Sequence, residues 1–468
     1  MTTVGDYATA ISRMLGLVDN ERVPHISPDT ERRHQPRYDL ARIDAFLTEL
    51  GGLQKGPPTI HIAGTKGKGS TAAMCANILR CQGYRVGMYS SPHLHTFRER
   101  ISLNGELIPE VRFAELLDRL WQPMQEVNAR SEGRVTVFEL LTAMGLAYFR
   151  EEETDFNVIE VGLGGRLDAT NVVAPAVSVI TSLSLDHTRV LGDTIEEIAW
   201  EKAGIIKEGI PVVSAPQEPG AMRVIRDTCV ERDSELVIVG EHVKWRVGAS
   251  EFPPTQRLAS PQCLEVEGRT GGHGLRVALL GSHQLENAAT AVAVMEILRE
   301  RGHEISQEAI AAGLETVRWP CRLEVLNEWE DGPLVVADGA HNPHSAERLR
   351  KALPGCFHYE NAIVIVGASR DKDLEGIVSA LAPVASQAVV TGTRHPRSAS
   401  RDVLANLFRK QGVQVRTATQ TAEAVSLALS LAGDNDLVLA TGSLFLAAEV
   451  REVVKGIPPE TYPQLSAV

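Results

Sequence analysis

The chain has 468 residues, more than one hydrophobic core usually holds, so its length predicts two domains. Its formal net charge of −13 argues against a nucleic-acid partner, because phosphate backbones are bound by positive charge. No apolar run approaches the roughly 20 residues of a membrane helix and the N-terminus lacks the pattern of a secretion signal, so we expect a cytoplasmic protein with no membrane partner.

Short β-branched runs alternate with helical patterns from about residue 59 to 215, which predicts βαβ units and a parallel sheet. The predicted strands are 59–63, 85–91, 156–162, 176–184 and 211–215. A hairpin is predicted within 101–108, because Asn104-Gly105 separates two extended segments. Residues 243–280 predict a small β-rich insert, and 283–302 predict a helix that ends at Gly302.

A second alternation follows, with strands predicted at 333–338, 362–367, 387–392 and 436–442 and helices between them. It predicts a second α/β domain, and Trp319-Pro320 is the predicted hinge between the two.

The stretch "HIAGTKGKGSTAAM", residues 61–74, puts glycines and two lysines between a predicted strand and a predicted helix. Backbone N–H groups and the helix dipole favour an anion there. Lys68 would then reach the terminal phosphates of a nucleotide, and the Ser70 hydroxyl would face a magnesium ion. The loop departs from the strict phosphate-loop spacing, since Lys68 follows Gly64 by four positions, and a simple glycine-rich turn is the alternative interpretation.

Polar residues also follow other predicted strands of the first domain: Ser90-Ser91, Glu160 and Asp186-His187. Ligands bind at the carboxyl ends of parallel strands, and a carboxylate, a hydroxyl and an imidazole that converge beside a nucleotide suit magnesium, which favours oxygen ligands and keeps several waters. Each residue alone has another explanation, namely a cap for the serines, a salt bridge for Glu160 and a core position for His187.

Lys202 lies in "AWEKAGIIKEG", where the residues alone indicate an ordinary solvated lysine on an amphipathic helix. The second domain carries polar loops after its predicted strands, and these suggest a second ligand-facing rim with a two-substrate cleft between the rims. The loop residues are Asp338, His341, Arg370, Asp371, Lys372, Arg394, Arg397 and Ser443.

Together these segments resemble the folylpolyglutamate synthase and dihydrofolate synthase family, amide ligases of the Mur ligase superfamily. The resemblance runs from about residue 55 to 455 and is carried by "AGTKGKGS", "SSPHL", "FRERI", "EVGLGGRLDATN", "SLDHT", "EKAGIIK", "HQLENAATA", "DGAHNPHS" and "ATGSLFLAAEV". It implies an ATP-binding, Mur ligase central-type domain at 1–317 and a smaller Rossmann-like glutamate-ligase domain at 318–468.

The activity implied by the resemblance is ATP-dependent addition of L-glutamate to dihydropteroate, to reduced folates, or to both. A substrate carboxylate would be activated as an acyl phosphate, which the amino group of glutamate attacks, releasing ADP and phosphate. The resemblance also implies magnesium, with two ions expected, and a monomer.

Site residues follow from the resemblance position by position. The phosphate loop comprises Gly64, Thr65, Lys66, Gly67, Lys68, Gly69 and Ser70, with Lys68 on the β- and γ-phosphates. Magnesium would be bound by Ser91, Glu160 and His187, and ATP would also contact Asn287, Arg322 and Asp338. His341 and Ser443 would lie near glutamate, and Lys202 matches a lysine that is carbamylated in this family, which replaces the solvated interpretation. The catalytic set is therefore Lys68, His187, Lys202, Asp338 and His341.

Three further arginines, Arg98, Arg100 and Arg166, are expected to face the anionic substrates, because an acidic protein must collect them at locally basic positions. The family usually has Asn at the position of Lys66 and Thr at that of Ser90, and Lys66 has no assigned role. The alternatives are a monofunctional folylpolyglutamate synthase, a Mur-type peptide ligase and a phosphate-loop protein without ligase activity.

Overall fold

The structure is a computed structural model that describes residues 6–17, 39–131, 133–248, 261–327 and 332–460. The described residues form two compact units. The first extends to Gly248 and includes Leu264–Arg276 and Leu285–Val317. The second includes residues 261–263, Val277–Gln284 and the described residues from Arg318 onward.

The first unit is built on an eight-stranded sheet in the order β4-β3-β2-β5-β1-β6-β7-β8. Its strands are β1 (Thr59–Ala63), β2 (Val86–Tyr89), β3 (Ile101–Leu103), β4 (Glu106–Leu107), β5 (Phe156–Glu160), β6 (Val177–Ile180), β7 (Val212–Ser214) and β8 (Leu236–Ile238). The six neighbouring strands β2, β5, β1, β6, β7 and β8 run parallel to one another, whereas β3 and β4 form the predicted antiparallel hairpin. The predicted parallel sheet is therefore confirmed, and β8 is an additional strand that was not predicted although Leu236–Ile238 is an apolar run.

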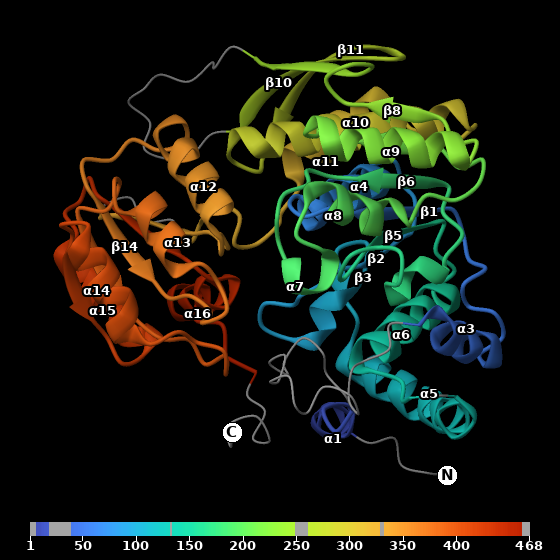
Figure 1. Ribbon diagram of the computed structural model, residues 1–468, viewed down its shortest axis with the longest axis horizontal. Helices are drawn as coiled ribbons and strands as arrows, with labels where there is room; N and C mark the ends of the chain where they lie inside the picture. The colour runs from blue at the N-terminus through green and yellow to red at the C-terminus, as the bar shows by residue number, and fades with distance from the viewer. Residues whose placement is uncertain (1–5, 18–38, 132, 249–260, 328–331, 461–468) are drawn as a thin grey trace. The chain divides into compact units, whose positions relative to one another are not determined.

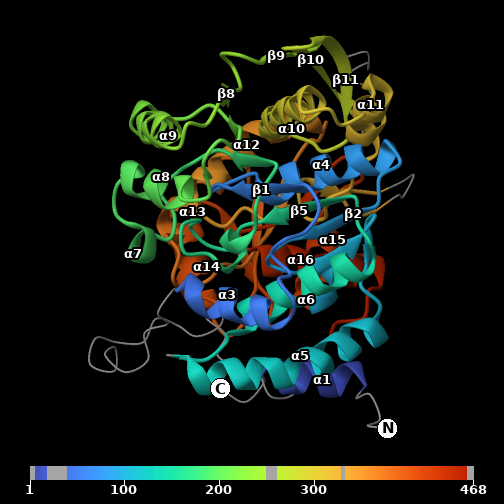
Figure 2. The same ribbon diagram turned by 90° about the vertical axis from the view of Figure 1, so that its right-hand side faces the viewer.

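The central strands β1 and β5 are buried along their whole length, as expected of a parallel sheet covered on both faces. The helices of this unit are α1 (Tyr7–Met14), α3 (Leu40–Glu49), α4 (Lys68–Cys81), α5 (Glu110–Arg130), α6 (Val137–Glu151), α7 (Thr188–Leu191), α8 (Ile195–Ala203), α9 (Pro219–Glu231), α10 (Ser282–Glu300) and α11 (Gln307–Thr316), with 3-10 turns at η1 (Phe97–Arg100) and η2 (Ala169–Val172). Helix α1 lies along α5 in both views (Figures 1 and 2). The rings of Tyr7 and Phe113, on these two helices, meet edge to face with their centroids 5.3 Å apart.

The predicted β-rich insert is confirmed as a three-stranded sheet in the order β11-β10-β9. Its strands are β9 (Lys244–Val247), β10 (Gln262–Gly268) and β11 (Gly271–Val277), and residues 249–260 of the prediction lie outside the described residues. The buried Glu296 of α10 accepts hydrogen bonds from the backbone N–H groups of Arg269 and Thr270, which ties the β10–β11 turn to that helix. Helix α10 itself is the predicted helix, and Gly302 follows its end with φ +94°.

The second unit has a six-stranded sheet in the order β12-β13-β17-β14-β15-β16. Its strands are β12 (Glu324–Val325), β13 (Leu334–Ala337), β14 (Ala362–Val366), β15 (Gln387–Val390), β16 (Gln414–Thr417) and β17 (Leu437–Thr441), and its helices are α12 (Pro343–Cys356), α13 (Leu374–Leu381), α14 (Arg401–Lys410), α15 (Thr421–Leu431) and α16 (Leu444–Lys455). All pairs are parallel except β12 with β13. The four predicted strands are confirmed. The edge strands β12 and β16 lack a continuous apolar run, so hydrophobic pattern did not reveal them.

None of the helices in the part of the chain that the structure describes combines the length and the apolar character needed to cross a membrane. The chain is thus an α/β protein whose two parallel-rich sheets each end in a set of polar loops, and the predicted site residues lie in these loops, at strand ends and on the helices α4, α8 and α10.

Candidate active site

The phosphate loop connects β1 to α4 and depends on two glycines. Gly64 has φ +154°, and a Cβ atom there would lie 1.8 Å from Oγ1 of Thr181. Gly67 has φ +91°, and a Cβ atom there would lie 2.3 Å from Oδ1 of Asn287. Any side chain at either position would therefore collide with a neighbour. The loop leads into the first turn of α4, whose backbone N–H groups form an anion-binding position, and Asn287 lies directly against it.

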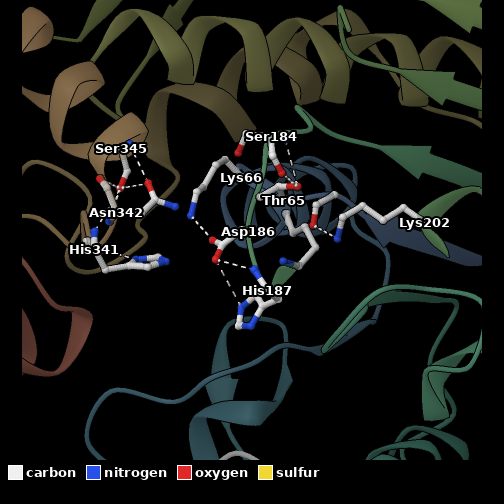
Figure 3. A network of polar contacts seen from close by, with 12 residues as sticks. Thr65, Lys66, Ser184, Asp186, His187, Lys202, His341, Asn342 and Ser345 are labelled. Atoms are coloured by element: carbon white, nitrogen blue, oxygen red, sulfur yellow. Dashed lines mark hydrogen bonds and ion pairs between the residues drawn. The ribbon is translucent and has the colours of Figure 1, made fainter. Parts of the chain in front are cut away.

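Backbone and hydroxyl hydrogen bonds fix this loop to the segment that follows β6. The N–H groups of Thr65 and Lys66 both donate to the carbonyl oxygen of Ser182, over 3.1 and 3.0 Å. The Thr65 hydroxyl donates to the carbonyl of Ser184 and accepts from its N–H, over 3.1 and 3.2 Å (Figure 3). The loop and the strand end thus form one rigid edge of the site.

Lys68, Ser91 and Glu160 meet at this edge. Glu160 is the last residue of β5 and is 4% exposed. One carboxylate oxygen lies 4.0 Å from Nζ of Lys68, and the other accepts a hydrogen bond of 3.3 Å from the N–H of Ser91. The carboxylate therefore lies between the phosphate-loop lysine and the loop after β2.

Asp186 and His187 lie on the neighbouring loop. Nζ of Lys66 is 2.9 Å from Oδ2 of Asp186, while Oδ1 of the same carboxylate accepts a 3.0 Å hydrogen bond from the N–H of His187. His187 adopts a left-handed conformation, with φ +52°, at the start of α7. Its side chain is 52% exposed, so the alternative interpretation of His187 as a core residue is wrong.

Lys202 is the most unusual ionisable group in the site. It is 4% exposed, and Nζ donates a 2.9 Å hydrogen bond to the carbonyl oxygen of Gly64 (Figure 3). Burial lowers the pKa of Lys202 to about 7, and the positive charges of Lys68 and Lys66 act in the same direction, against an opposing effect of Asp186. The residue-based interpretation as a solvated lysine is therefore wrong, and a neutral, nucleophilic amine is accessible near neutral pH.

Arg166 holds the helix that carries Lys202. Its N–H donates to the carbonyl of Glu201 over 2.8 Å, and its guanidinium contacts the carboxylate of Glu201, also at 2.8 Å. The same guanidinium lies over the ring of Trp200 at 4.4 Å. The predicted substrate residue Arg166 is thus bonded to the C-terminal turn of α8, and its contact with substrate stays a prediction.

The other two predicted substrate arginines lie around η1. Arg98 donates through Nε to the carbonyl of Ile108 over 2.7 Å and pairs with Glu110 at 3.1 Å. Arg100 is 2% exposed and donates through Nε to Nδ1 of His93 over 3.0 Å. These contacts order the loop between β2 and β3, and binding of substrate by either arginine stays a prediction.

A buried chain of polar groups beneath the phosphate loop escaped the sequence analysis. Nε2 of His61 lies 2.9 Å from Oγ1 of Thr170, and that hydroxyl donates to Oδ1 of Asp168 over 2.5 Å. Burial lowers the pKa of His61 to about 3, so the ring is neutral. Because the Thr170 hydroxyl gives its proton to Asp168, Nε2 of His61 is the donor in the 2.9 Å contact. His61 and Thr170 are 109 positions apart, and no local pattern could have indicated this contact.

In the second unit, Asp338 fixes the turn that carries Arg322. Its two carboxylate oxygens accept backbone hydrogen bonds from Leu323 and Ala340, over 3.0 and 2.9 Å. Burial raises the pKa of Asp338, and the nearby Arg322 charge opposes that effect. Cys321 and Leu323 both have positive φ, of +56° and +46°, so the turn is held in a strained form around Arg322.

His341 and Ser443 lie at the strand ends of the same unit. Nδ1 of His341 is 2.8 Å from the carbonyl of Gly339, which can only accept, so Nδ1 carries the proton (Figure 3). In the neutral ring Nε2 is then the basic nitrogen. Ser443 is 4% exposed and caps α16 by accepting from the N–H of Phe445 over 3.2 Å.

No three His, Cys, Asp or Glu side chains gather as a metal site within the described ranges. The predicted magnesium ligands in the first unit are instead one hydroxyl, one carboxylate and one imidazole, from Ser91, Glu160 and His187. Magnesium commonly keeps several waters and uses substrate phosphate oxygens, so this sparse donor set suits an ion that arrives with a nucleotide.

The sequence matches two family models: the Mur ligase middle domain over residues 62–295, and the glutamate ligase domain of Mur ligases over residues 321–444. The dihydrofolate synthase/folylpolyglutamate synthase of Bacillus subtilis is 34% identical over 433 residues, which cover 89% of this chain and 95% of the relative.

Two solved structures share the fold. Folylpolyglutamate synthase from Mycobacterium tuberculosis, complexed with ADP and AMPPCP, superposes with a TM-score of 0.83 at 32% identity, covering 92% of this chain and 98% of that one. FolC from Escherichia coli, in complex with DHPP and ADP, superposes with a TM-score of 0.81 at 30% identity, covering 97% of this chain and 98% of the other.

Proposed function

The chain belongs to the dihydrofolate synthase/folylpolyglutamate synthase family of ATP-dependent ligases, and from this premise we propose that it joins L-glutamate both to dihydropteroate and to reduced folates. The observation that carries the proposal is the hydrogen bond from the buried Lys202 amine to the phosphate loop, beside Lys68 and Glu160. A loop whose only role was to hold a nucleotide would not need a buried lysine with a lowered pKa bonded to its first glycine.

The first unit would bind ATP and activate the carboxylate. The N–H groups of the first turn of α4 and the Lys68 ammonium would hold the terminal phosphates. A carboxylate oxygen of the pterin-bearing substrate would attack the γ-phosphorus, the bond to ADP would break, and an acyl phosphate would form. The site residues are proposed to act chiefly by positioning and charge stabilisation, as is usual for phosphoryl transfer.

Magnesium would be held by Ser91, Glu160 and His187, and it would neutralise charge that develops on the phosphates. We propose that the Lys202 amine adds to CO2, forming an N–C bond and releasing one proton. The product is a carbamate anion, which offers oxygen ligands where an ammonium would repel a cation. The pKa of about 7 supports this proposal, since only the neutral amine can attack CO2.

The amino group of glutamate would then attack the acyl carbon, phosphate would leave, and the nitrogen would lose a proton. His341 is suited to accept that proton, because the hydrogen bond to Gly339 keeps its own proton on Nδ1 and leaves Nε2 basic. We further propose that residues 1–317 and 318–468 are the two domains, and that a single chain is sufficient for the reaction.

The experiment is a product analysis. The protein is incubated with ATP, magnesium, L-glutamate and either dihydropteroate or tetrahydrofolate, and the products are weighed by mass spectrometry while ADP release is recorded. We expect one glutamate added to dihydropteroate, one or more added to tetrahydrofolate, and ADP release only when both co-substrates are present. Lys68→Ala serves as the inactive reference, with Lys55→Ala as the matched control on the surface.

Each alternative has its own result in the same experiment. Product from tetrahydrofolate alone indicates a monofunctional folylpolyglutamate synthase. ADP release without glutamate or a pteroate contradicts the ligase proposal and indicates a nucleotide-hydrolysing protein instead. A Mur-type peptide ligase would use neither pterin.

A further inference from the structure

The phosphate loop contains a second lysine, Lys66, which does not lie with Lys68 against Glu160. Its ammonium is 2.9 Å from Oδ2 of Asp186, with the Lys66 side chain 16% and the Asp186 side chain 9% exposed (Figure 3). We propose that Lys66 and Asp186 form a positioning pair that fixes His187 for magnesium, so Lys66 acts through Asp186 rather than on the phosphates. This inference rests on the proposed function, which supplies the magnesium at His187.

The Asp186 carboxylate is shared between the pair and the backbone of His187. Oδ2 contacts the Lys66 ammonium, and Oδ1 accepts the 3.0 Å hydrogen bond from the N–H of His187. The ring of His187 also lies near that carboxylate, with Nε2 3.9 Å from Oδ1. The carboxylate therefore links the Lys66 ammonium directly to His187, whose backbone has a positive φ.

The backbone at His187 explains why support is needed. A φ of +52° is uncommon for any residue with a Cβ atom, although His enters this region more often than most, and the surrounding contacts hold it there. His187 begins the short helix α7, so this conformation decides where the ring points. With half of the side chain exposed, packing alone does not hold the ring.

The contacts between the two loops form a series that ends at this pair. Ala63 accepts from the N–H of Thr181, the N–H groups of Thr65 and Lys66 donate to Ser182, and the Thr65 hydroxyl bonds to Ser184. The Lys66–Asp186 contact is the last of the series and the only one here that joins two charges. A change at Lys66 would therefore release the far end of the segment without opening the β6 end.

The charges around the pair indicate why the lysine stays on Asp186. The positive charges of Lys66 and Lys68 both lower the pKa of Lys202, so the three amines are close enough to repel one another. Pairing Lys66 with Asp186 and directing Lys68 toward Glu160, 4.0 Å away, gives each of the two loop ammonium groups its own carboxylate. Removing the Lys66 charge leaves a largely buried Asp186 carboxylate without this counter-charge, and it would turn toward water and release His187.

The test measures ADP binding by calorimetry in EDTA and again in saturating magnesium, for the wild type, Lys66→Met, Asp186→Asn and the double variant. We expect each single variant to bind ADP in EDTA with the affinity of the wild type. The increase in ADP affinity caused by magnesium should be about 10-fold smaller than in the wild type, which is the size typical of losing a residue that orients a metal ligand. The double variant should lose no more than either single one, since both remove the same link. Arg226→Met, which breaks an exposed ion pair with Glu241 on the same unit, is the matched control.

Three outcomes overturn the inference. Weaker ADP binding by Lys66→Met in EDTA assigns Lys66 to the phosphates. A much larger loss in Asp186→Asn than in Lys66→Met makes Asp186 a metal ligand in its own right. Additive losses in the double variant show that the residues act separately. A wild type in which magnesium leaves ADP affinity unchanged contradicts the proposed magnesium site itself, and this result is distinguishable from all three.

Discussion

The amine of Lys202 donates a 2.9 Å hydrogen bond to the carbonyl oxygen of Gly64, so helix α8 is bonded directly to the first glycine of the phosphate loop. The two residues are 138 positions apart. Protonation, carbamylation or loss of the Lys202 amine would therefore change a hydrogen bond of the phosphate loop. The first two predictions follow from this contact.

Lys202→Ala should lower turnover by about 10²–10³-fold, the usual cost of removing one preorganised electrostatic group. If the active form is a carbamate, acetate or another short-chain carboxylate should restore part of the activity, because it supplies the missing oxygens. Steady-state kinetics with and without added carboxylate measure this. Full activity in the variant, or no rescue at any concentration, would rule out the carbamate role.

The stability of the nucleotide-free protein should rise with pH between about 7 and 10.5. Lys202 has a folded pKa of about 7 against an ordinary value of 10.5, so in that window the unfolded chain binds more protons than the folded one. Below pH 7 both states are protonated and the folded state bears the full cost of the buried charge. Urea unfolding in CO2-free buffer across pH 6–11 should show this rise, flattened in Lys202→Met but kept in Lys244→Met, which removes an exposed lysine.

Gly67→Ala should abolish tight ADP binding, whereas Gly83→Ala should leave it intact. Both glycines have positive φ, +91° and +102°, so both substitutions should cost about 1–2 kcal/mol of unfolding free energy. Only at Gly67 would the new Cβ meet a neighbour, Oδ1 of Asn287 at 2.3 Å, and nothing lies within 4 Å of that atom at Gly83. Calorimetric ADP titration and thermal melts of the two variants separate backbone strain from the collision. Equal ADP affinities would contradict this account of the loop.

His341→Ala should reduce glutamate-dependent turnover by about 10²–10⁴-fold, the range expected when a general base is lost. ADP affinity should stay within a few-fold of the wild type, since Nδ1 of His341 bonds to the carbonyl of Gly339 in its own loop. The comparison variant is His358→Ala, at an exposed position of the same unit. A collapse of ADP binding in His341→Ala would reassign this residue to the nucleotide.

Local patterns in the sequence were enough to predict much of the fold. The buried strands of both sheets show as short β-branched runs, because a strand covered on both faces has no polar side. The phosphate loop was equally visible, since its glycines are required by backbone geometry that can be read from a few consecutive residues. Strands β12 and β16 were missed because they lie at sheet edges and lack a continuous apolar run, whereas β8 has the apolar run Leu236–Ile238 and was overlooked.

The sequence by itself determined the two α/β units, the phosphate loop and, through its motifs, the family. Only the tertiary structure decided the state of individual groups: Lys202 reads as a surface lysine on an amphipathic helix until the fold buries it against Gly64. The same holds for Lys66, whose partner Asp186 is 120 positions away. A pKa and an ion pair depend on desolvation and on charges that folding brings together, so neither can be predicted from the neighbouring residues in the sequence.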